Sequence, residues 1–173
     1  VVGLGASLDL REVLDVGVLG ASLAVASIVG CLLLGLLLAR VFRVDPVTGL
    51  LVAAGTAICG GSAIAAVAPT IRARGHQVTA ALGTVFVLNA LALLVFPAIG
   101  DGLHMNAEQF GLWSAIAIHD TSSVVGAAMS HGERALEIAT TVKLSRALWI
   151  VPLTVTLAWR ARRADPSNED GPR

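Results

Sequence analysis

Residues 53–68 read AAGTAICGGSAIAAVA, an almost wholly apolar run interrupted at its centre by Cys59, Gly60, Gly61 and Ser62. Adjacent glycines disfavour a continuous helix by about 1 kcal/mol each relative to alanine. The run therefore predicts two half-helices, with Gly61 supplying the permissive backbone and Ser62 capping the second half. Broken helices at membrane depth line a cavity or lie buried in protein, and in transporters they often form the substrate site. A glycine-rich packing face between two helices is the alternative.

The composition is that of a protein with several membrane spans. The chain has 173 residues, of which 55% are hydrophobic and 14% are charged, whereas soluble domains carry about a quarter charged residues. The lipid bilayer is thus an expected partner. Twelve basic and twelve acidic residues balance, so the charge indicates no nucleic-acid partner. The two cysteines lie within apolar runs and form no disulfide framework.

The apolar runs divide the chain into a membrane domain, 1–159, and a polar tail, 160–173, that we expect to be disordered. Residues 1–8 resemble the end of a span whose beginning is missing, which predicts a fragment of a longer chain. The expected full spans are long enough to cross about 30 Å of hydrocarbon; they cover residues 16–41, 78–99 and 139–159. Polar loops are expected at 9–15, 100–108 and 131–137.

Two further segments, 45–74 and 109–130, are apolar at both ends and polar in the middle. Asp45 and Pro46 suit the N-cap and first position of a helix. The positive-inside rule places the arginine-rich loops in the cytoplasm, and these are Arg40/Arg43, Arg72/Arg74 and Arg160/Arg162/Arg163. All three satisfy the rule if both segments enter the membrane and return on the same side. Simple crossings with one violated loop are the alternative.

The first candidate site is the break itself. A half-helix N-terminus presents unpaired N–H groups and a positive dipole end, which suits an anion. Thr56 and Ser62 add hydroxyl donors beside the backbone of Gly60 and Gly61. Cys59 is more typical of a small packing residue, because no second Cys or His has metal-ligand spacing with it.

The second candidate is the sequence His119, Asp120, Thr121, Ser122. Ionisable residues within an apolar run are costly and indicate function. Asp120 could cap a half-helix or fix the His119 tautomer, and His119 could carry a proton. The alternatives are a polar surface loop and a Ser-His-Asp hydrolase using Ser62 or Ser122, although the chain has no G-x-S-x-G elbow.

The third candidate is the pair Lys143 and Arg146, which lie three residues apart on one helix face. Facing the protein interior, the two cations would attract an anion and help to set its selectivity. Snorkelling of both side chains to the interface is the alternative. For Asn89, a hydrogen bond between helices is the more typical role.

Four stretches together resemble the YeiH-type family of sulfate exporters, which are bacterial and archaeal inner-membrane proteins long catalogued as uncharacterised. The stretches are GTAICGGSAIAAVAP at 55–69, FVLNALALLVFPAIG at 86–100, FGLWSAIAIHDTSSVVGAA at 110–128 and KLSRALWIVP at 143–152. The family chain is about twice as long, and the resemblance is to its C-terminal half. It implies an all-α, multi-pass bundle in the cell inner membrane, about one repeat of an inverted-repeat transporter fold, whose site is completed by the missing N-terminal half.

The leading functional hypothesis is secondary transport of a small anion, sulfate or an organic sulfonate. A membrane enzyme using His119 and Asp120 with a serine nucleophile is the second hypothesis, and a non-transporting scaffold or sensor is the third. No cofactor or metal is predicted. The expected substrate-binding residues cluster at the two breaks and on the last span: Thr56, Cys59, Gly60, Gly61, Ser62, His119, Asp120, Thr121, Ser122, Lys143 and Arg146.

Overall fold

The computed structural model describes residues 17–164, and over that range the chain is helical without strands. Its helices are α3 (Gly17–Val41), α4 (Pro46–Ala57), α5 (Gly61–Thr70), α6 (Gly75–Gly102), α7 (Ala107–Ala117), α8 (Thr121–Met129), α9 (Glu133–Ala147) and α10 (Ile150–Ala164). This confirms the expected all-α bundle with broken helices. The expected stub, the 9–15 loop and most of the expected tail lie outside the described residues.

The first break falls where the glycine pair predicts it, between α4 and α5. Helix α4 ends at Ala57, and Gly60 adopts φ 65° and ψ −126°, a backbone conformation that favours glycine. The prediction is wrong in two details. Gly60 rather than Gly61 takes the unusual conformation, and Ser62 does not cap α5. The Ser62 hydroxyl donates to the Cys59 carbonyl at 3.1 Å instead.

The N-terminus of α4 and the second break also follow their sequence signals. The Asp45 carboxylate accepts from the Thr48 backbone N–H at 2.9 Å, and this bond lowers the pKa of Asp45 below its usual value. Helix α7 stops at Ala117, and the Asp120 side chain caps α8 by accepting from the N–H groups of Ser122 and Ser123. Capping is therefore the role that the structure gives Asp120.

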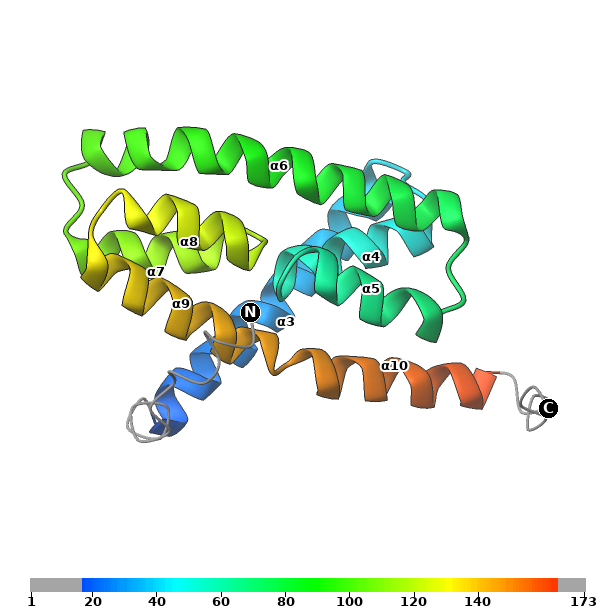
Figure 1. Cartoon of the computed structure of the whole chain (residues 1–173). Coiled ribbons are helices and arrows are strands. Elements are labelled where there is room, and N and C mark those ends of the chain that lie inside the picture. The colour runs from blue at the N-terminus through cyan, green and yellow to red at the C-terminus, as the bar shows by residue number, and fades with distance from the viewer. Residues whose placement is uncertain (1–16, 165–173) are drawn as a thin grey trace.

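Each pair of half-helices forms a hairpin that returns to the end of the molecule where it began (Figure 1). At one end, the Gln77 amide donates to Asp45 at 2.9 Å and joins the starts of α4 and α6. At the other end, His131 lies 3.3 Å from Asp101, so the end of α8 meets the end of α6. The hairpins thus enter from opposite ends and their tips meet in the middle, which agrees with the arrangement that the arginine pattern favours.

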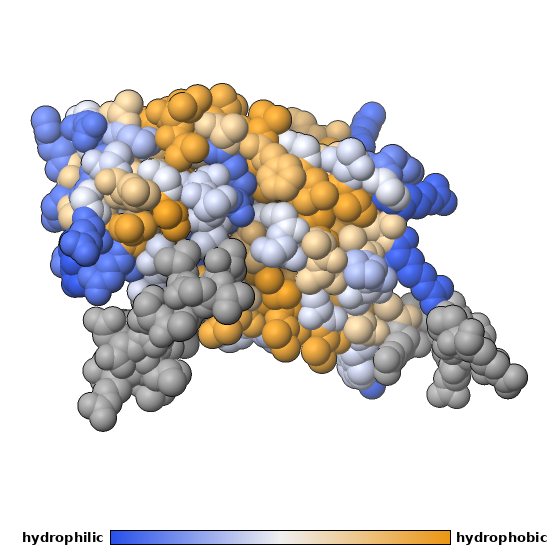
Figure 2. All heavy atoms as spheres, in the orientation of Figure 1, coloured by the Kyte–Doolittle hydropathy of each residue, from blue (hydrophilic) through white to orange (hydrophobic). Residues whose placement is uncertain are grey.

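The flanks of this bundle are apolar and its ends are polar. Figure 2 shows hydrophobic residues across the middle of the visible face and hydrophilic residues at both ends. The stretches Gly75–Gly102 and Glu133–Ala161 are long and apolar enough to cross a membrane. Large apolar side chains are exposed along α6, including Leu91, Leu94 and Ile99. We therefore describe the chain as a membrane-spanning bundle, with lipid against its flanks.

The last span departs from the prediction of one helix over 139–159. Helix α9 already begins at Glu133, and the path turns at Leu148 and Trp149 before α10. Pro152 explains the turn, because proline has no N–H to donate to the carbonyl of Leu148 and its ring crowds that group. The expected 131–137 loop is correspondingly shorter, and α10 continues to Ala164, past the predicted start of the tail.

We expect Gly60→Ala to destabilise the full-length protein by about 1–3 kcal/mol, because a side chain at this φ and ψ is strained. Gly61→Ala is the matched control: Gly61 begins α5, and an added methyl group would meet the side chains of the exposed Phe86 at 3.3 Å and of Leu82 at 3.5 Å. Thermal unfolding of both variants in detergent measures the difference. Equal melting temperatures for the two variants would show that Gly60 carries no special backbone requirement.

Single cysteines test the two hairpins in a cysteine-free background of the full-length protein. Phe42→Cys and His76→Cys flank α4–α5 and should react with an impermeant thiol reagent from the cytoplasmic side. Leu103→Cys and Glu133→Cys flank α7–α8 and should react only from the opposite side. If either flanking pair splits between the two sides, that segment crosses the membrane instead of returning.

Candidate functional site

The two hairpin tips touch through their backbones. A Cβ atom placed on Gly60 would lie 3.4 Å from both the N and Cα atoms of Asp120, and 3.3 Å from the Val85 side chain. This approach is a second reason for glycine at the tip. The C-terminal ends of α4 and α7 and the N-terminal ends of α5 and α8 therefore come together beside the middle of α6, at the depth where the bilayer offers no water.

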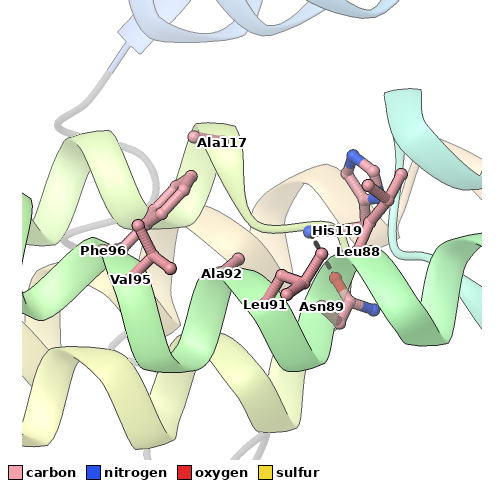
Figure 3. Close-up of a pocket in the computed structure, with 8 residues that line it drawn as sticks. All are labelled: Leu88, Asn89, Leu91, Ala92, Val95, Phe96, Ala117 and His119. Carbon is pink, nitrogen blue, oxygen red and sulfur yellow. Dashed lines mark hydrogen bonds between the residues drawn. The ribbon is translucent and has the colours of Figure 1, made fainter.

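Asn89 of α6 ties the second break in place. Asn89 is 4% exposed, and its Oδ1 accepts from the backbone N–H of His119 at 3.0 Å (Figure 3) and from that of Asp120 at 3.2 Å. The expected bond between helices is confirmed. Because two donors fix the oxygen, the amide nitrogen must point elsewhere, and this buried Nδ2 has no partner among residues 17–164. An unpaired buried donor costs about 1–3 kcal/mol, which marks it as a candidate ligand-binding group.

Lys143 and Arg146 of α9 point inward, with side chains buried to 0% and 4% exposure, so the snorkelling alternative is wrong. Lys143 Nζ donates to the carbonyls of Ile118 at 2.6 Å and Ala115 at 3.3 Å. Arg146 donates to Ala57 at 2.6 Å and Ile116 at 3.4 Å. The two cations thus satisfy unpaired carbonyls at the negative ends of α7 and α4, and they place positive charge beside both breaks.

The N-terminal ends of α5 and α8, which both lie at the junction, differ in their capping. Asp120 caps α8, whereas α5 begins after Gly60 and has no side-chain cap. The first-turn N–H groups of α5 have no acceptor within their own helix, and the positive end of its dipole lies at the junction. An anion is the ligand that such an end favours.

The remaining predicted site residues take supporting places. Cys59 is buried in an apolar cluster, with its Sγ 2.9 Å from the Ser62 hydroxyl, which agrees with a packing role. Thr56 lies partly buried in the last turn of α4, and Thr121 begins α8. The Ser122 hydroxyl donates to Asp120. Among the described residues, no three His, Cys, Asp or Glu side chains are grouped to hold a metal ion.

Sequence reasoning did not place Asn89 in the site, and it did not find the cavity beside it. This cavity, of about 280 Å³, lies along α6 and is lined by Leu88, Asn89, Leu91, Ala92, Val95, Phe96, Ala117 and His119 (Figure 3). The buried Nδ1 of His119 has no partner within the described part of the chain. The sequence feature that could have placed Asn89 in the site is its position as the one strongly polar residue of the apolar span 78–99.

The fold and site define a helical membrane protein in which two opposed helical hairpins meet at their tips. The chain belongs to the family described as Conserved hypothetical protein 698, whose model matches residues 1–172. The resemblance to the YeiH-type family is thereby confirmed.

Curated relatives carry the name UPF0324 membrane protein. The chain is 58% identical to the one from Bdellovibrio bacteriovorus, over 89% of this chain and 47% of the relative. It is 52% identical to the one from Vibrio parahaemolyticus, over 97% of this chain and 54% of the relative. The chain therefore spans about half the length of the curated relatives it matches. No solved structure matches it significantly.

We expect Lys143→Met to destabilise the protein by about 1.5–3 kcal/mol, because methionine keeps the volume but leaves the Ile118 and Ala115 carbonyls unpaired. Arg134→Met is the matched control. Arg134 lies on the same helix with 58% exposure and, within the described range, pairs with the surface residues Glu108 and Glu137, so its loss should cost under about 1 kcal/mol. Thermal unfolding compares the two, and a Lys143→Met protein as stable as the control would contradict the capping role.

Proposed function

We propose that the full-length protein is a secondary transporter of a small anion, sulfate or an organic sulfonate, in the cell inner membrane. The observation that carries the proposal is the unpaired Asn89 Nδ2, buried beside the junction of the hairpin tips. A bound anion would accept from this donor and from the uncapped N-terminus of α5. Broken helices at mid-membrane are the usual substrate sites of secondary transporters.

Charge at the junction supports the same proposal. Lys143 and Arg146 lie behind the two breaks, and Asp120 is the one carboxylate among the described residues at this depth. Burying an isolated anion is costly, so nearby positive charges must offset the cost. A transporter must also release the anion, so these charges should not hold it through many direct bonds. In this proposal the cations act mainly through their field, since their described hydrogen bonds go to carbonyls.

Catalysis by a serine nucleophile has less support. The Ser62 hydroxyl donates to Cys59 and the Ser122 hydroxyl donates to Asp120. Within residues 17–164, neither hydroxyl is hydrogen-bonded to the His119 ring, so no serine is activated there in the way that a hydrolase requires.

Asn89→Asp tests the proposal sharply. Aspartate keeps the acceptor for the His119 and Asp120 N–H groups, but it replaces the free donor with a negative oxygen. We expect uptake of sulfate and sulfonates into liposomes containing the full-length protein to fall by roughly tenfold or more, because a hydrogen bond to a charged ligand is lost and repulsion is added.

Asn106→Asp is the matched control, because Asn106 caps α7 in a loop through the same side-chain oxygen and should tolerate the exchange. Wild-type uptake by a correctly folded Asn89→Asp protein would rule out the site. A wild-type protein that carries none of these anions would rule out the function.

A further inference from the structure

The two ends of the bundle, both hydrophilic in Figure 2, carry opposite charge. Among the described residues, Arg134 is the one arginine or lysine at the end where α9 begins, and four carboxylates surround it there: Asp101, Glu108, Glu133 and Glu137. At the end where α4 and α6 begin, Asp45 is the one described acidic residue. We call this second end the basic end, because it carries six exposed arginines: Arg40, Arg43, Arg72, Arg74, Arg160 and Arg163.

Three segments that are distant in sequence bring these arginines to one surface. The Gln77 amide donates to Asp45 at 2.9 Å and so ties the turn before α6 to the turn before α4. Leu153 and Leu157 of α10 pack against the apolar cluster of α4, α5 and α6, and α10 ends at the same end of the molecule as α5 (Figure 1). The positive charge is therefore concentrated by the fold and not spread along the chain.

The described part of the chain supplies little negative charge to neutralise this surface. The Asp45 carboxylate already accepts from the Thr48 backbone N–H and from the Gln77 amide, and one carboxylate cannot balance six guanidinium groups. Exposed cations of one sign on one surface repel each other and attract an anionic partner.

Trp159 indicates the level of this surface relative to the bilayer. Trp159 is 52% exposed, and the guanidinium carbon of Arg163 lies 3.5 Å from the centroid of its ring. Tryptophan is enriched where the hydrocarbon meets the head groups, and an arginine stacked on it one turn later reaches the head groups themselves. The basic end thus lies at the depth of the lipid phosphates.

We propose that the basic end is a binding surface for anionic phospholipid head groups, such as that of phosphatidylglycerol. The planar guanidinium group matches a phosphate with two parallel hydrogen bonds, and an anionic leaflet attracts basic residues that lie near its surface. A bound head group at the turns before α4 and α6 would stabilise the base of the first hairpin. The inference does not depend on transport, because it concerns the base of this hairpin and not its tip.

Lipid titration provides the first test. Short-chain phosphatidylglycerol and phosphatidylcholine are titrated against the full-length protein in a non-ionic detergent, and binding is followed by microscale thermophoresis. Phosphatidylglycerol should bind roughly tenfold tighter or more, because each arginine beside an anionic head group tightens binding several-fold. Raising the salt concentration to about 0.5 M should reduce this preference by screening. Inorganic phosphate should not displace the lipid, because it has no acyl chains to hold it at the surface.

A matched set of arginine variants provides the second test. Arg43→Gln combined with Arg74→Gln removes one charge from each of the two turns that Gln77 ties together, and the preference for phosphatidylglycerol should fall roughly fivefold or more. Arg134→Gln removes an exposed arginine from the opposite end and should retain the wild-type preference. Melting temperatures in phosphatidylcholine check that both proteins are folded.

Four outcomes would overturn the inference. The two lipids could bind equally well, the double variant could keep the wild-type preference, or Arg134→Gln could lose as much preference as the double variant. Displacement of phosphatidylglycerol by inorganic phosphate would identify a site for small anions in place of a lipid surface. Preference for phosphatidylglycerol that falls with salt and with the double variant alone would support the proposal.

Discussion

Backbone groups left unpaired by interrupted helices are the constraint on which this structure depends. Inside a bilayer no water satisfies them, so the protein must supply a partner for each helix end. Lys143 does so for α7, Arg146 for α4 and Asp120 for α8. Helix α5 receives no such cap. This uncapped end and the unpaired Asn89 amide nitrogen together support the anion chemistry proposed for the junction.

A single helix holds both hairpins. Lys143 and Arg146 project from one face of α9. Lys143 bonds to the second hairpin, and Arg146 bonds to both hairpins. The positions of the two tips are therefore not independent, because a shift of α9 would alter the partners of both. Asn89 of α6 adds a third attachment, because its side chain bonds to the backbone of the second hairpin at His119. Asn89 and His119 also line the cavity along α6.

Much of the fold was predictable because its signals are local. Adjacent glycines, a capping Asp and a polar interruption each mark a helix end in the residues themselves. The choice of Gly60 over Gly61 was not predictable, because it depends on contact with Asp120, sixty residues away. The pairing of Arg146 with Ala57 is equally non-local. The turn before α10 has a local signal in Pro152.

The tips of the two opposed hairpins meet in the middle of the bundle, and we propose that both hairpins re-enter the membrane and that their tips lie near its centre. A cryo-electron microscopy map of the full-length protein in lipid nanodiscs tests it most directly. We expect Gly60 and Asp120 in backbone contact near the bilayer centre, with the Lys143 and Arg146 head groups against the ends of α7 and α4. Tips separated by lipid or by another helix, or either segment traversing the bilayer as a continuous span, would contradict the account.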